Sequence, residues 1–371
     1  MSGKQAWSDL DRVAMSRALM LAERGLYGTD PNPRVGCVLV RDGVVVGEGF
    51  HALAGGPHAE TLALQAAGER ARGATAYVSL EPCDHHGRTP PCTLALIEAG
   101  ITRVVYALRD PDPRVCGNGE ERLRAAGLDV RSGLMAEASA ELNVGFVSRL
   151  QKGRPFVRVK LAMSLDGRTA LANGESRWIT SNVARKDAQR FRARSSAVLT
   201  GVGTILADDP ALNVRIPESD RQPWRIVLDS RLRTPSDSRV INREGRVLIF
   251  GAHEDAARRR SLEAQGAAVE IVPGDDRGLD LRAVLERLAA LQMNEIWVEA
   301  GAVLAGRFVE EGLVDELIVY TAPSLLGSGA RPLMALPEPA SLESRLQFEY
   351  TDFRLIGPDL RLTARPVRGA D

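Results

Sequence analysis

The apolar positions in the first part of the chain follow two different periods. Over residues 9–24 they recur at helical spacing behind Ser8, a possible cap, so this stretch is predicted to form an amphipathic helix. Over residues 35–50 the pattern changes to two continuous apolar runs separated by Asp42-Gly43, which is typical of a β-hairpin. Strand-like and helix-like segments then alternate through the rest of this half.

The second half of the chain restarts with an apolar strand at residues 156–164 and again alternates strands with helices. It closes with two strand-like runs around residues 357–359, which predict an antiparallel pair. Such alternation predicts α/β domains in which a largely parallel sheet is covered by helices on both faces. A short polar stretch with Gly and Pro, residues 151–155, separates the halves. We therefore expect one domain over residues 1–150 and a second over residues 151–371.

Composition narrows the class of protein. The 371 residues include 48 Lys and Arg against 48 Asp and Glu, and 44% are hydrophobic, as in soluble globular proteins. Zero net charge without a basic stripe argues against a protein that grips long stretches of nucleic acid. No apolar run approaches the roughly 18 residues of a spanning helix, and the first residues lack a secretory signal, so we expect a cytoplasmic protein. Its four cysteines then favour metal binding or catalysis over disulfides.

The sharpest chemical pattern joins a histidine, a glutamate and two cysteines. His58 and Glu60 begin a predicted helix, and Cys83 and Cys92 bracket a loop further along the chain. One imidazole and two thiolates suit Zn²⁺ and leave a fourth position for water, as in catalytic zinc sites. Cys92 follows two prolines at a predicted helix N-terminus, where the helix dipole favours a thiolate. Glu60 can move protons between the water and a leaving amine without binding the metal.

Each element of this pattern has a simpler alternative. A lone His-x-Glu is common at helix starts, and unpaired cysteines often pack as small hydrophobic residues. The combined order of His-x-Glu, Pro-Cys and Cys is that of zinc deaminases, which favours the metal site. The other two cysteines differ from this pair. Cys37 lies inside an apolar strand and is predicted to be in the core, whereas Cys116 lies in a polar loop, where we favour an idle thiol over a spare ligand.

The segment HAE, followed by EPCDHHGRTPPC, resembles the cytidine-deaminase superfamily. Nucleobase deaminases have two residues between the cysteines, whereas this chain has eight. The longer insert resembles the pyrimidine deaminases of riboflavin biosynthesis, whose bacterial forms are fused to a reductase, and PNPRVGCV at residues 31–38 is similar to their pocket-lining segment. The resemblance implies a cytidine-deaminase-like, three-layer α/β/α domain. That domain would remove the 2-amino group of 2,5-diamino-6-ribosylamino-4-pyrimidinone 5′-phosphate as ammonia.

The resemblance also implies roles for individual residues of the first half. The histidine and the two bracketing cysteines would hold zinc, and Glu60 would be the proton shuttle. Within the insert, His85, His86 and Arg88 are candidates for gripping the substrate, with Arg88 at its phosphate, and either histidine can equally brace the loop. Asn32 can hydrogen-bond the ribose or the ring, and stabilisation of a turn is the alternative.

The second half lacks the usual fingerprint of a dinucleotide site. A Gly-x-Gly at residues 201–203 follows an apolar strand, but Leu206 stands where a third glycine would be needed. Another segment, residues 295–306, is predicted to be a buried strand, then Glu299 and Gly301, then a helix whose free N–H groups can cradle a phosphate. A glycine turn needed only for chain reversal is the alternative.

Three segments of the second half resemble the reductase of riboflavin biosynthesis: VKLAMSLDGRTALANGESRWIT, LTGVGTILADDPALNVR and VEAGAVLAG. The resemblance implies a fold like that of dihydrofolate reductase and NADPH as the cofactor, which would explain the missing fingerprint. The implied cofactor contacts are Ala162, Trp178, Thr204, Asp208, Ser230, Gly301, Ala302, Val303, Leu304, Ala305 and Gly306. The implied substrate contacts are Lys160, Ser176, Arg192, Leu212, Arg215 and Glu299.

These implied contacts leave some roles open. The two arginines are suited to clamp a phosphate, because guanidinium offers fixed paired donors. Hydride from NADPH would open and reduce the ribosyl unit to ribityl, and the proton donor for that step stays open between Lys160 and Glu299. Trp178 can instead be a core aromatic, and Asp208 can belong to a turn that ends a helix.

Two other classes of protein compete with a bifunctional enzyme. One is a nucleoside or nucleic-acid zinc deaminase with an accessory domain, and the long insert and the neutral charge count against it. The other is a zinc-stabilised binding protein without catalysis. For the bifunctional enzyme we expect small phosphorylated pyrimidines as substrates, no nucleic-acid or membrane partner, and a homo-oligomer, a dimer or larger, whose interface the sequence does not identify.

Overall fold

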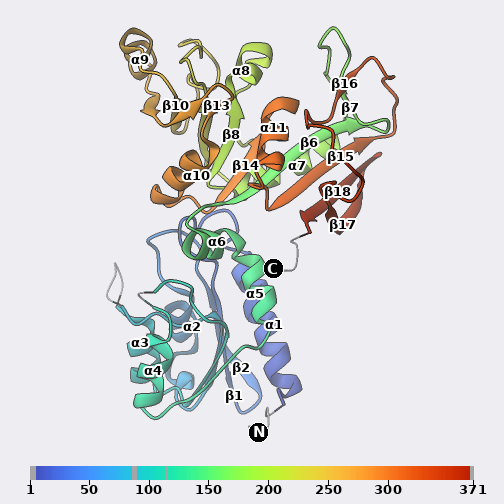
Figure 1. The fold of residues 1–371 in the computed structure, drawn as a ribbon. Helices are drawn as coiled ribbons and strands as arrows, with labels where there is room; N and C mark the ends of the chain where they lie inside the picture. The colour runs from blue at the N-terminus through green and yellow to red at the C-terminus, as the bar shows by residue number, and fades with distance from the viewer. Residues whose placement is uncertain (1–5, 86–89, 114, 368–371) are drawn as a thin grey trace. The chain divides into compact units, whose positions relative to one another are not determined.

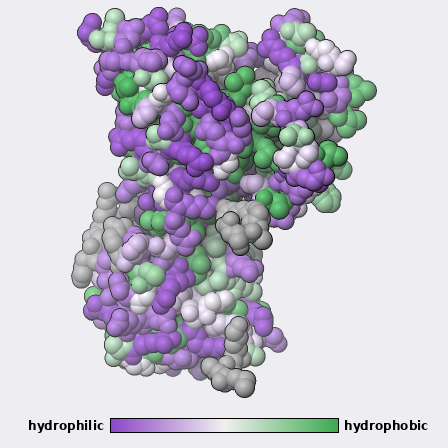
Figure 2. Space-filling model, in the orientation of Figure 1, coloured by the Kyte–Doolittle hydropathy of each residue, from purple (hydrophilic) through white to green (hydrophobic). Residues whose placement is uncertain are grey.

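The computed structural model describes residues 6–85, 90–113 and 115–367. The chain divides into two compact units, Met1–Gly153 and Arg154–Asp371 (Figure 1). Within the described ranges, no helix combines the length and the apolar character that a bilayer span requires. Figure 2 shows that the visible face is mostly hydrophilic, with hydrophobic residues scattered over it.

Unit 1 is built on a mixed sheet. Its strands, in sheet order, are β2 (Val44–Phe50), β1 (Gly36–Arg41), β3 (Thr75–Leu80), β4 (Arg103–Leu108) and β5 (Asp129–Ser132). Its helices are α1 (Asp9–Glu23), α2 (Ala59–Ala67), the short 3₁₀ helix η1 (Gly68–Ala71), α3 (Cys92–Glu98), α4 (Asn118–Ala125), α5 (Ala136–Leu142) and α6 (Val144–Lys152).

The sheet of unit 1 is less parallel than the sequence pattern predicted. The hairpin reverses the chain between β1 and β2. Helix α2 then connects β2 to β3, and β3 runs in the same direction as β2. Strand β1 lies between these two strands and is therefore antiparallel to both, whereas β3, β4 and β5 are parallel. The expectation of a largely parallel sheet is thus wrong for β1, because a tight hairpin precedes the first crossover.

Helices cover both faces of this sheet, as expected for a three-layer α/β/α domain. Apolar residues of α1 pack on one face with Val38 and Tyr77, and apolar residues of α2, α3 and α4 pack on the other with Leu39 and Val78. Helix α1 begins where the sequence predicted, because the Ser8 hydroxyl accepts the Asp11 N–H and the Asp11 carboxylate accepts the Ser8 N–H.

Unit 2 is built on a longer sheet. Its strands, in sheet order, are β11 (Ala268–Ile271), β10 (Val247–Gly251), β9 (Trp224–Leu228), β8 (Ala197–Gly201), β14 (Glu295–Glu299), β6 (Phe156–Ser164), β15 (Glu316–Ala322), β18 (Asp359–Pro366) and β17 (Phe348–Ile356). Short pairs join β12 (Gly274–Asp275) to β13 (Gly278–Leu279) and β16 (Arg331–Pro332) to β7 (Arg168–Ala170). Its helices are α7 (Asn182–Arg194), α8 (Val202–Asp208), α9 (Ala256–Glu263), α10 (Leu281–Ala290) and α11 (Ala302–Glu310).

The long sheet is parallel from β11 to β15 and ends in the predicted antiparallel pair of β18 and β17. Helices α10 and α11 cover one face, and α7, α8 and α9 cover the other. Strands β8, β14 and β6 are neighbours in the middle of the sheet, so their carboxyl ends meet at one edge. In open α/β sheets, ligands bind in the crevice at that edge.

Candidate functional site

Three side chains of unit 1 that could hold a metal come from separate elements. His58 is the residue immediately before α2, and its side chain does not cap that helix. Cys83 lies in the loop after β3, and Cys92 is the first residue of α3, as the sequence predicted. The Cys92 N-terminal position and its burial at 1% exposure place the thiol under the helix dipole and away from bulk water.

The ligand atoms of these residues converge on one point. His58 Nδ1 lies 3.2 Å from Cys92 Sγ and 3.5 Å from Cys83 Sγ, and all three atoms lie within 4.8 Å of one another. Around a tetrahedral zinc ion, neighbouring nitrogen and sulfur ligands are separated by roughly 3.5 Å. The donor set and its spacing therefore fit zinc and leave one coordination position for water.

Without a metal, the electrostatics of the cluster favour a thiolate at Cys83 and a protonated thiol at Cys92. A hydrogen bond from the Cys92 thiol, together with His58, lowers the pKa of Cys83. The same hydrogen bond to the half-buried Cys83, together with burial of Cys92 itself, raises the pKa of Cys92. A metal cation displaces such a shared proton and leaves both sulfurs as thiolates.

Glu60 lies beside the cluster in the first turn of α2 and is 3% exposed. Burial raises the pKa of its carboxyl to about 7, and the carboxyl is hydrogen-bonded to Cys92. A carboxyl group that titrates near neutral pH can accept a proton in one step and return it in the next. The arrangement suits a hydrolytic reaction in which water attacks and an amine leaves.

Asn32 is held next to the zinc ligands by a histidine that the sequence patterns did not single out. His51 Nδ1 lies 2.9 Å from the Pro57 carbonyl oxygen, so this nitrogen donates and Nε2 accepts from the Asn32 amide at 3.1 Å. The rings of His51 and His58 meet edge to face, 5.6 Å apart. The Asn32 side chain is thus oriented by His51, whose ring contacts that of His58.

The insert between the two cysteines is tied down at its base. The Thr93 N–H donates to the Cys83 carbonyl at 3.2 Å, and the Thr93 hydroxyl donates to Asp84. His85 follows with an exposed side chain. The candidates His86 and Arg88 lie outside the described residues.

Two buried acids near the cluster were also missed from sequence. The Glu81 carboxylate accepts the backbone N–H groups of Asp110 and Gly117, at 3.2 and 3.1 Å, and so anchors the loop before α4. Burial raises the pKa of Asp110 to about 7, with smaller contributions from the nearby acids Asp112 and Glu81. The sequence of this loop, with its prolines and glycines, indicated only a turn.

In unit 2 the structure brings together three of the four charged substrate candidates, which come from different elements. Lys160 of β6 is paired with Glu299 of β14, and Arg192 of α7 makes two hydrogen bonds to the Glu299 carboxylate, at 2.5 and 2.7 Å. Burial opposes ionisation of Glu299, but Arg192 and Lys160 outweigh it and lower its pKa to about 2. Burial also lowers the pKa of Lys160, although Glu299 opposes that shift.

A buried tryptophan fixes this carboxylate from a third direction. The indole N–H of Trp297 donates to Glu299 Oε1 at 2.7 Å, and the ring stacks on Phe191 with centroids 5.0 Å apart. Sequence reasoning had assigned Trp297 only to a buried strand. The available signal was its position two residues before Glu299 on the same strand face.

The other substrate candidates take different positions around this cluster. Arg215 donates to Asn213 Oδ1 at 2.7 Å, and the Asn213 carbonyl accepts from Arg192 at 3.0 Å, so Asn213 joins the two arginines. The Leu212 side chain is 3% exposed and packs in the core, which leaves only its backbone for a ligand contact. Ser176 instead lines a pocket of about 430 Å³.

Most of the expected cofactor contacts gather at the carboxyl edge of the sheet. Gly301 lies exposed at the N-terminus of α11 with open space where a side chain would be, and Val303 is 70% exposed in the first turn. Thr204 lies in the neighbouring α8, and Asp208 at the end of that helix lines the same pocket as Ser176. Free helix N–H groups and an open glycine fit the phosphates of a dinucleotide.

Three other expected cofactor contacts differ in how exposed they are to solvent. Trp178 is 68% exposed and stacks under Arg185 at 4.2 Å, so the alternative of a core aromatic is wrong. Ala305 is fully buried, and a side chain on Gly306 would meet the Ala335 carbonyl oxygen at 2.1 Å. These last two residues pack the helix against the fold, and the open backbone of α11 lies in its first turn.

Known proteins match both units. Residues 155–362 match the family "RibD C-terminal domain", and residues 8–108 match the "Cytidine and deoxycytidylate deaminase zinc-binding region". The chain is 50% identical over 364 residues to the riboflavin biosynthesis protein RibD of Escherichia coli, covering 95% of this chain and 98% of that protein. The RibD protein of Haemophilus influenzae is 46% identical, over 97% of this chain and 98% of its own.

Solved structures agree with these matches. RibD of Acinetobacter baumannii is 43% identical, with a TM-score of 0.90 over 97% of this chain and 99% of that one. A diaminohydroxyphosphoribosylaminopyrimidine deaminase/5-amino-6-(5-phosphoribosylamino)uracil reductase from Thermotoga maritima is 34% identical, with a TM-score of 0.85 over 96% and 99% of the two chains.

The convergent metal-binding side chains of unit 1 and the family matches of the two units define a zinc-dependent deaminase joined to an NADPH-dependent reductase. The chain belongs to the RibD family of riboflavin biosynthesis proteins, and it is a bifunctional hydrolase and oxidoreductase of that pathway.

Proposed function

We propose that unit 1 releases ammonia from 2,5-diamino-6-ribosylamino-4(3H)-pyrimidinone 5′-phosphate. Unit 2 then uses NADPH to reduce the ribosyl group of the product, 5-amino-6-(5-phosphoribosylamino)uracil, to ribityl. The observation that carries the first half is the convergence of His58, Cys83 and Cys92 beside the buried carboxyl of Glu60. The cluster of Lys160, Arg192 and Glu299, near the carboxyl edge of the long sheet, supports the reduction step.

For deamination, we assign the three converging side chains to zinc and the proton transfers to Glu60. Bound zinc supplies a Lewis acid that activates water for attack on the ring carbon that carries the amino group. Glu60 accepts a proton of the attacking water and passes it to the ring nitrogen, then takes the remaining hydroxyl proton and delivers it to the leaving amine. Its pKa of about 7 suits these transfers. Burial of Glu60 keeps bulk water away from these transfers.

We assign binding of the diaminopyrimidinone phosphate to side chains around the metal-binding cluster. His51 fixes the Asn32 amide through a hydrogen bond of 3.1 Å, which leaves the Asn32 carbonyl oxygen free to accept from the ring or the ribose. His85, on the exposed base of the insert, is a second candidate contact. Arg88 is assigned to the 5′-phosphate on chemical grounds, because guanidinium matches phosphate geometry.

For reduction, we assign Glu299, Lys160, Arg192 and Arg215 to the ribosyl phosphate, together with Ser176 and the backbone of Leu212. NADPH supplies the hydride when bound. Arg192 is already engaged in two hydrogen bonds with Glu299, so its main task is to hold that carboxylate. The Arg215 guanidinium donates to the neutral Asn213 side chain and has no ion pair with an acid among the described residues, and Arg215 is therefore the better phosphate clamp.

The dinucleotide is assigned to the residues at the carboxyl edge of β6, β8, β9 and β14. The first turn of α11 and Thr204 of α8 offer backbone donors for its phosphates. Trp178 and Val303 offer exposed apolar surface for its rings. The remaining assigned contacts are Ala162, Asp208 and Ser230.

The partners of the chain follow from these sites. Small phosphorylated pyrimidines are its substrates, and neither nucleic acid nor membrane is a partner. Four cysteines without a disulfide among the described residues suit the reducing cytoplasm. The competing function, a nucleoside or nucleic-acid deaminase, lacks support because the family match covers unit 2 as well.

A substrate panel tests this proposal. The full chain is incubated with the diaminopyrimidinone phosphate, with cytidine and with a tRNA, and ammonia is measured before NADPH is added. We expect ammonia from the pyrimidinone phosphate alone, followed by NADPH oxidation. Ammonia from cytidine or tRNA, and none from the pyrimidinone, would overturn the proposal.

A further inference from the structure

Asp166 lies in the turn that follows β6 and binds the backbone of a loop far along the chain. Its carboxylate accepts the N–H of Leu326 at 3.1 Å and that of Gly327 at 2.7 Å. The hydroxyl of Ser164, the last residue of β6, donates to the same carboxylate. Hydrogen bonds from Ser164 and from the two backbone groups lower the pKa of Asp166 to about 2. The carboxylate is therefore ionised at neutral pH, and its hydrogen bonds are charge-assisted.

A small two-stranded sheet continues from this turn. Strands β7 and β16 pair antiparallel beyond the ends of β6 and β15 (Figure 1). The Leu165 N–H also donates to the Ser324 carbonyl oxygen at 2.7 Å. These contacts join residues 165–176 to residues 324–332, and we call the two segments together the arm.

The arm has little apolar core of its own. It lies wholly within the described residues, and only Ala170 and Ala330 of it are buried. Leu165 and Leu325 are 67% and 72% exposed. Segments with few buried contacts open at low free energy, so the position of the arm depends on its polar contacts. Among these contacts, the Asp166 carboxylate joins both segments of the arm to the end of β6.

The first segment of the arm ends at the pocket that contains Ser176. The arm contributes Gly174, Glu175 and Ser176 to the lining of this pocket, and α8 contributes residues 206–208. The turn before Ser176 is closed within the arm, because the Leu171 N–H donates to the Glu175 carbonyl oxygen at 2.8 Å. The position of Ser176 relative to α8 therefore follows the position of the arm.

We propose that Asp166 is a positioning residue for the reduction, because its carboxylate fixes the arm where Ser176 meets the ribosyl phosphate. This inference rests on the substrate contact proposed above for Ser176, and it adds a residue that itself touches neither substrate nor cofactor. An arm that is ordered before the substrate arrives loses less conformational entropy on binding. Asp166 therefore lowers the KM for the phosphorylated intermediate without taking part in hydride transfer.

A purely structural role of Asp166 makes a different kinetic prediction. If Asp166 only stabilises the fold, its replacement reduces the fraction of folded enzyme, which lowers kcat and leaves KM unchanged. If Asp166 positions Ser176, the folded enzyme loses affinity for the intermediate in the ground state and the transition state alike. Such a loss raises KM and leaves kcat unchanged.

Asp166→Asn tests this distinction. The variant keeps the shape of the side chain but loses its charge and one of its two acceptor oxygens. NADPH oxidation by the full chain is measured with the phosphorylated intermediate, and binding of the intermediate without NADPH is measured by titration calorimetry. We expect the KM and the dissociation constant to rise about tenfold, as for loss of a hydrogen bond to a charged group. The kcat should stay within about twofold of the wild type.

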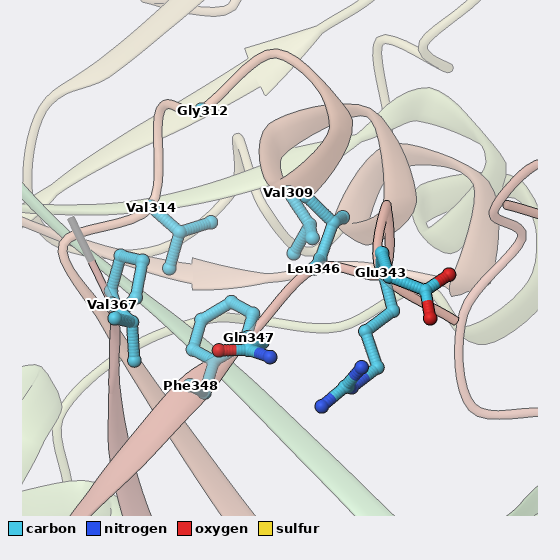
Figure 3. Close-up of a pocket in the computed structure, with 10 residues that line it drawn as sticks. Val309, Gly312, Val314, Glu343, Leu346, Gln347, Phe348 and Val367 are labelled. Carbon is cyan, nitrogen blue, oxygen red and sulfur yellow. The ribbon is translucent and has the colours of Figure 1, made fainter. Parts of the chain in front are cut away.

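Glu343→Gln is the matched control. Hydrogen bonds from its own backbone N–H and from Ser341 lower the pKa of Glu343, so this residue is also an acid held by a loop of unit 2. It lines a cavity of about 360 Å³ near the start of β15, whereas the arm follows the end of that strand (Figure 3). We expect this variant to bind and reduce the intermediate as the wild type does.

Ser176→Ala connects the effect of Asp166 to the pocket. Alone it should raise the KM about tenfold, and adding it to Asp166→Asn should cause no further rise, because both substitutions remove the same contact. Three results would each overturn the proposal: a lower kcat with an unchanged KM in Asp166→Asn, a wild-type KM in Ser176→Ala, or effects of the two substitutions that multiply. A wild type that binds the intermediate without reducing it would contradict the proposed function instead, and calorimetry would still test Asp166.

Discussion

The indole N–H of Trp297 donates a hydrogen bond of 2.7 Å to Oε1 of Glu299, the same oxygen that accepts from Arg192 Nε. The tryptophan ring is buried and stacked, so it is a rigid donor. Glu299 is thus fixed by a guanidinium on one side and an indole on the other. Both contacts help to lower the pKa of Glu299 to about 2.

Trp297→Phe tests whether this contact positions Glu299 for reduction. The variant keeps the aromatic packing but removes the donor, so we expect the kcat/KM of the reductase to fall about tenfold, as for a lost hydrogen bond to a charged group. The acid limb of the reductase pH profile should move upward, because the pKa of Glu299 rises. Deamination should be unchanged. Trp224→Phe on β9 is the matched control, and equal losses in both variants would mean a general packing defect.

The two pairs of cysteines should differ in their effect on zinc. We expect about one zinc ion per chain in the wild type and nearly none in Cys83→Ala and Cys92→Ala, because each removes one of three protein ligands. Cys37→Ala and Cys116→Ala should keep the metal. Mass spectrometric metal analysis after dialysis measures this directly. A zinc content that depends on Cys116 would show that the ligand set is wrong.

Arg215→Gln tests the assignment of the phosphate clamp. We expect the KM of the reductase to rise at least about tenfold for the phosphorylated intermediate and to stay the same for its dephosphorylated analogue, because only the former carries the charge. Steady-state NADPH oxidation with both compounds separates binding from folding. Equal losses with the two compounds would place Arg215 away from the phosphate.

Stability in acid should depend on Asp11 at the start of α1. Burial alone would raise its pKa, but hydrogen bonds from Ser8, Arg103 and Tyr77 outweigh it and lower the pKa from 3.8 to about 2. A depressed pKa contributes stability above the unfolded pKa, near pH 4, and this contribution is lost as the pH falls toward 2.

The matched variant for this test is Asp11→Asn. In denaturant titrations, the free energy of unfolding of the wild type should exceed that of the variant by up to about 2 kcal/mol at pH 7. This difference in the free energy of unfolding should narrow between pH 4 and pH 2. Loss of zinc in acid should affect both proteins equally, so it does not account for the change. Asp42→Asn, at an exposed position in the hairpin turn, should show no such dependence. A difference that grows in acid would contradict the assigned network.

Sequence alone predicted those parts of the fold that depend on local pattern. The capped helix α1, the hairpin and the closing strand pair follow from spacing and turn residues. The convergence of His58, Cys83 and Cys92 could also be predicted, because metal chemistry restricts the residue types and their order in the chain. Sequence did not predict the direction of β1 relative to β3, since strand direction depends on which crossover follows the hairpin.

The missed residues share one property, which is that only tertiary structure brings them to the sites. His51 meets Asn32 across a turn, and Trp297 stacks on Phe191 only through the packing of α7 on the sheet. The burial of Leu212 could not be predicted either, because the apolar residues of its segment follow neither a helical nor a strand period. Local pattern therefore identifies the reacting groups, whereas the groups that orient them emerge from packing.

Glu60→Gln in the full chain tests the central claim most directly. Ammonia release from the diaminopyrimidinone phosphate, zinc content and NADPH-dependent reduction of the deaminated intermediate are measured on the same preparation. We predict that deamination falls by about a thousandfold, as expected for loss of a general acid–base, while about one zinc ion per chain and full reductase activity remain. Deamination at the wild-type rate would contradict the assignment of Glu60 as the proton shuttle.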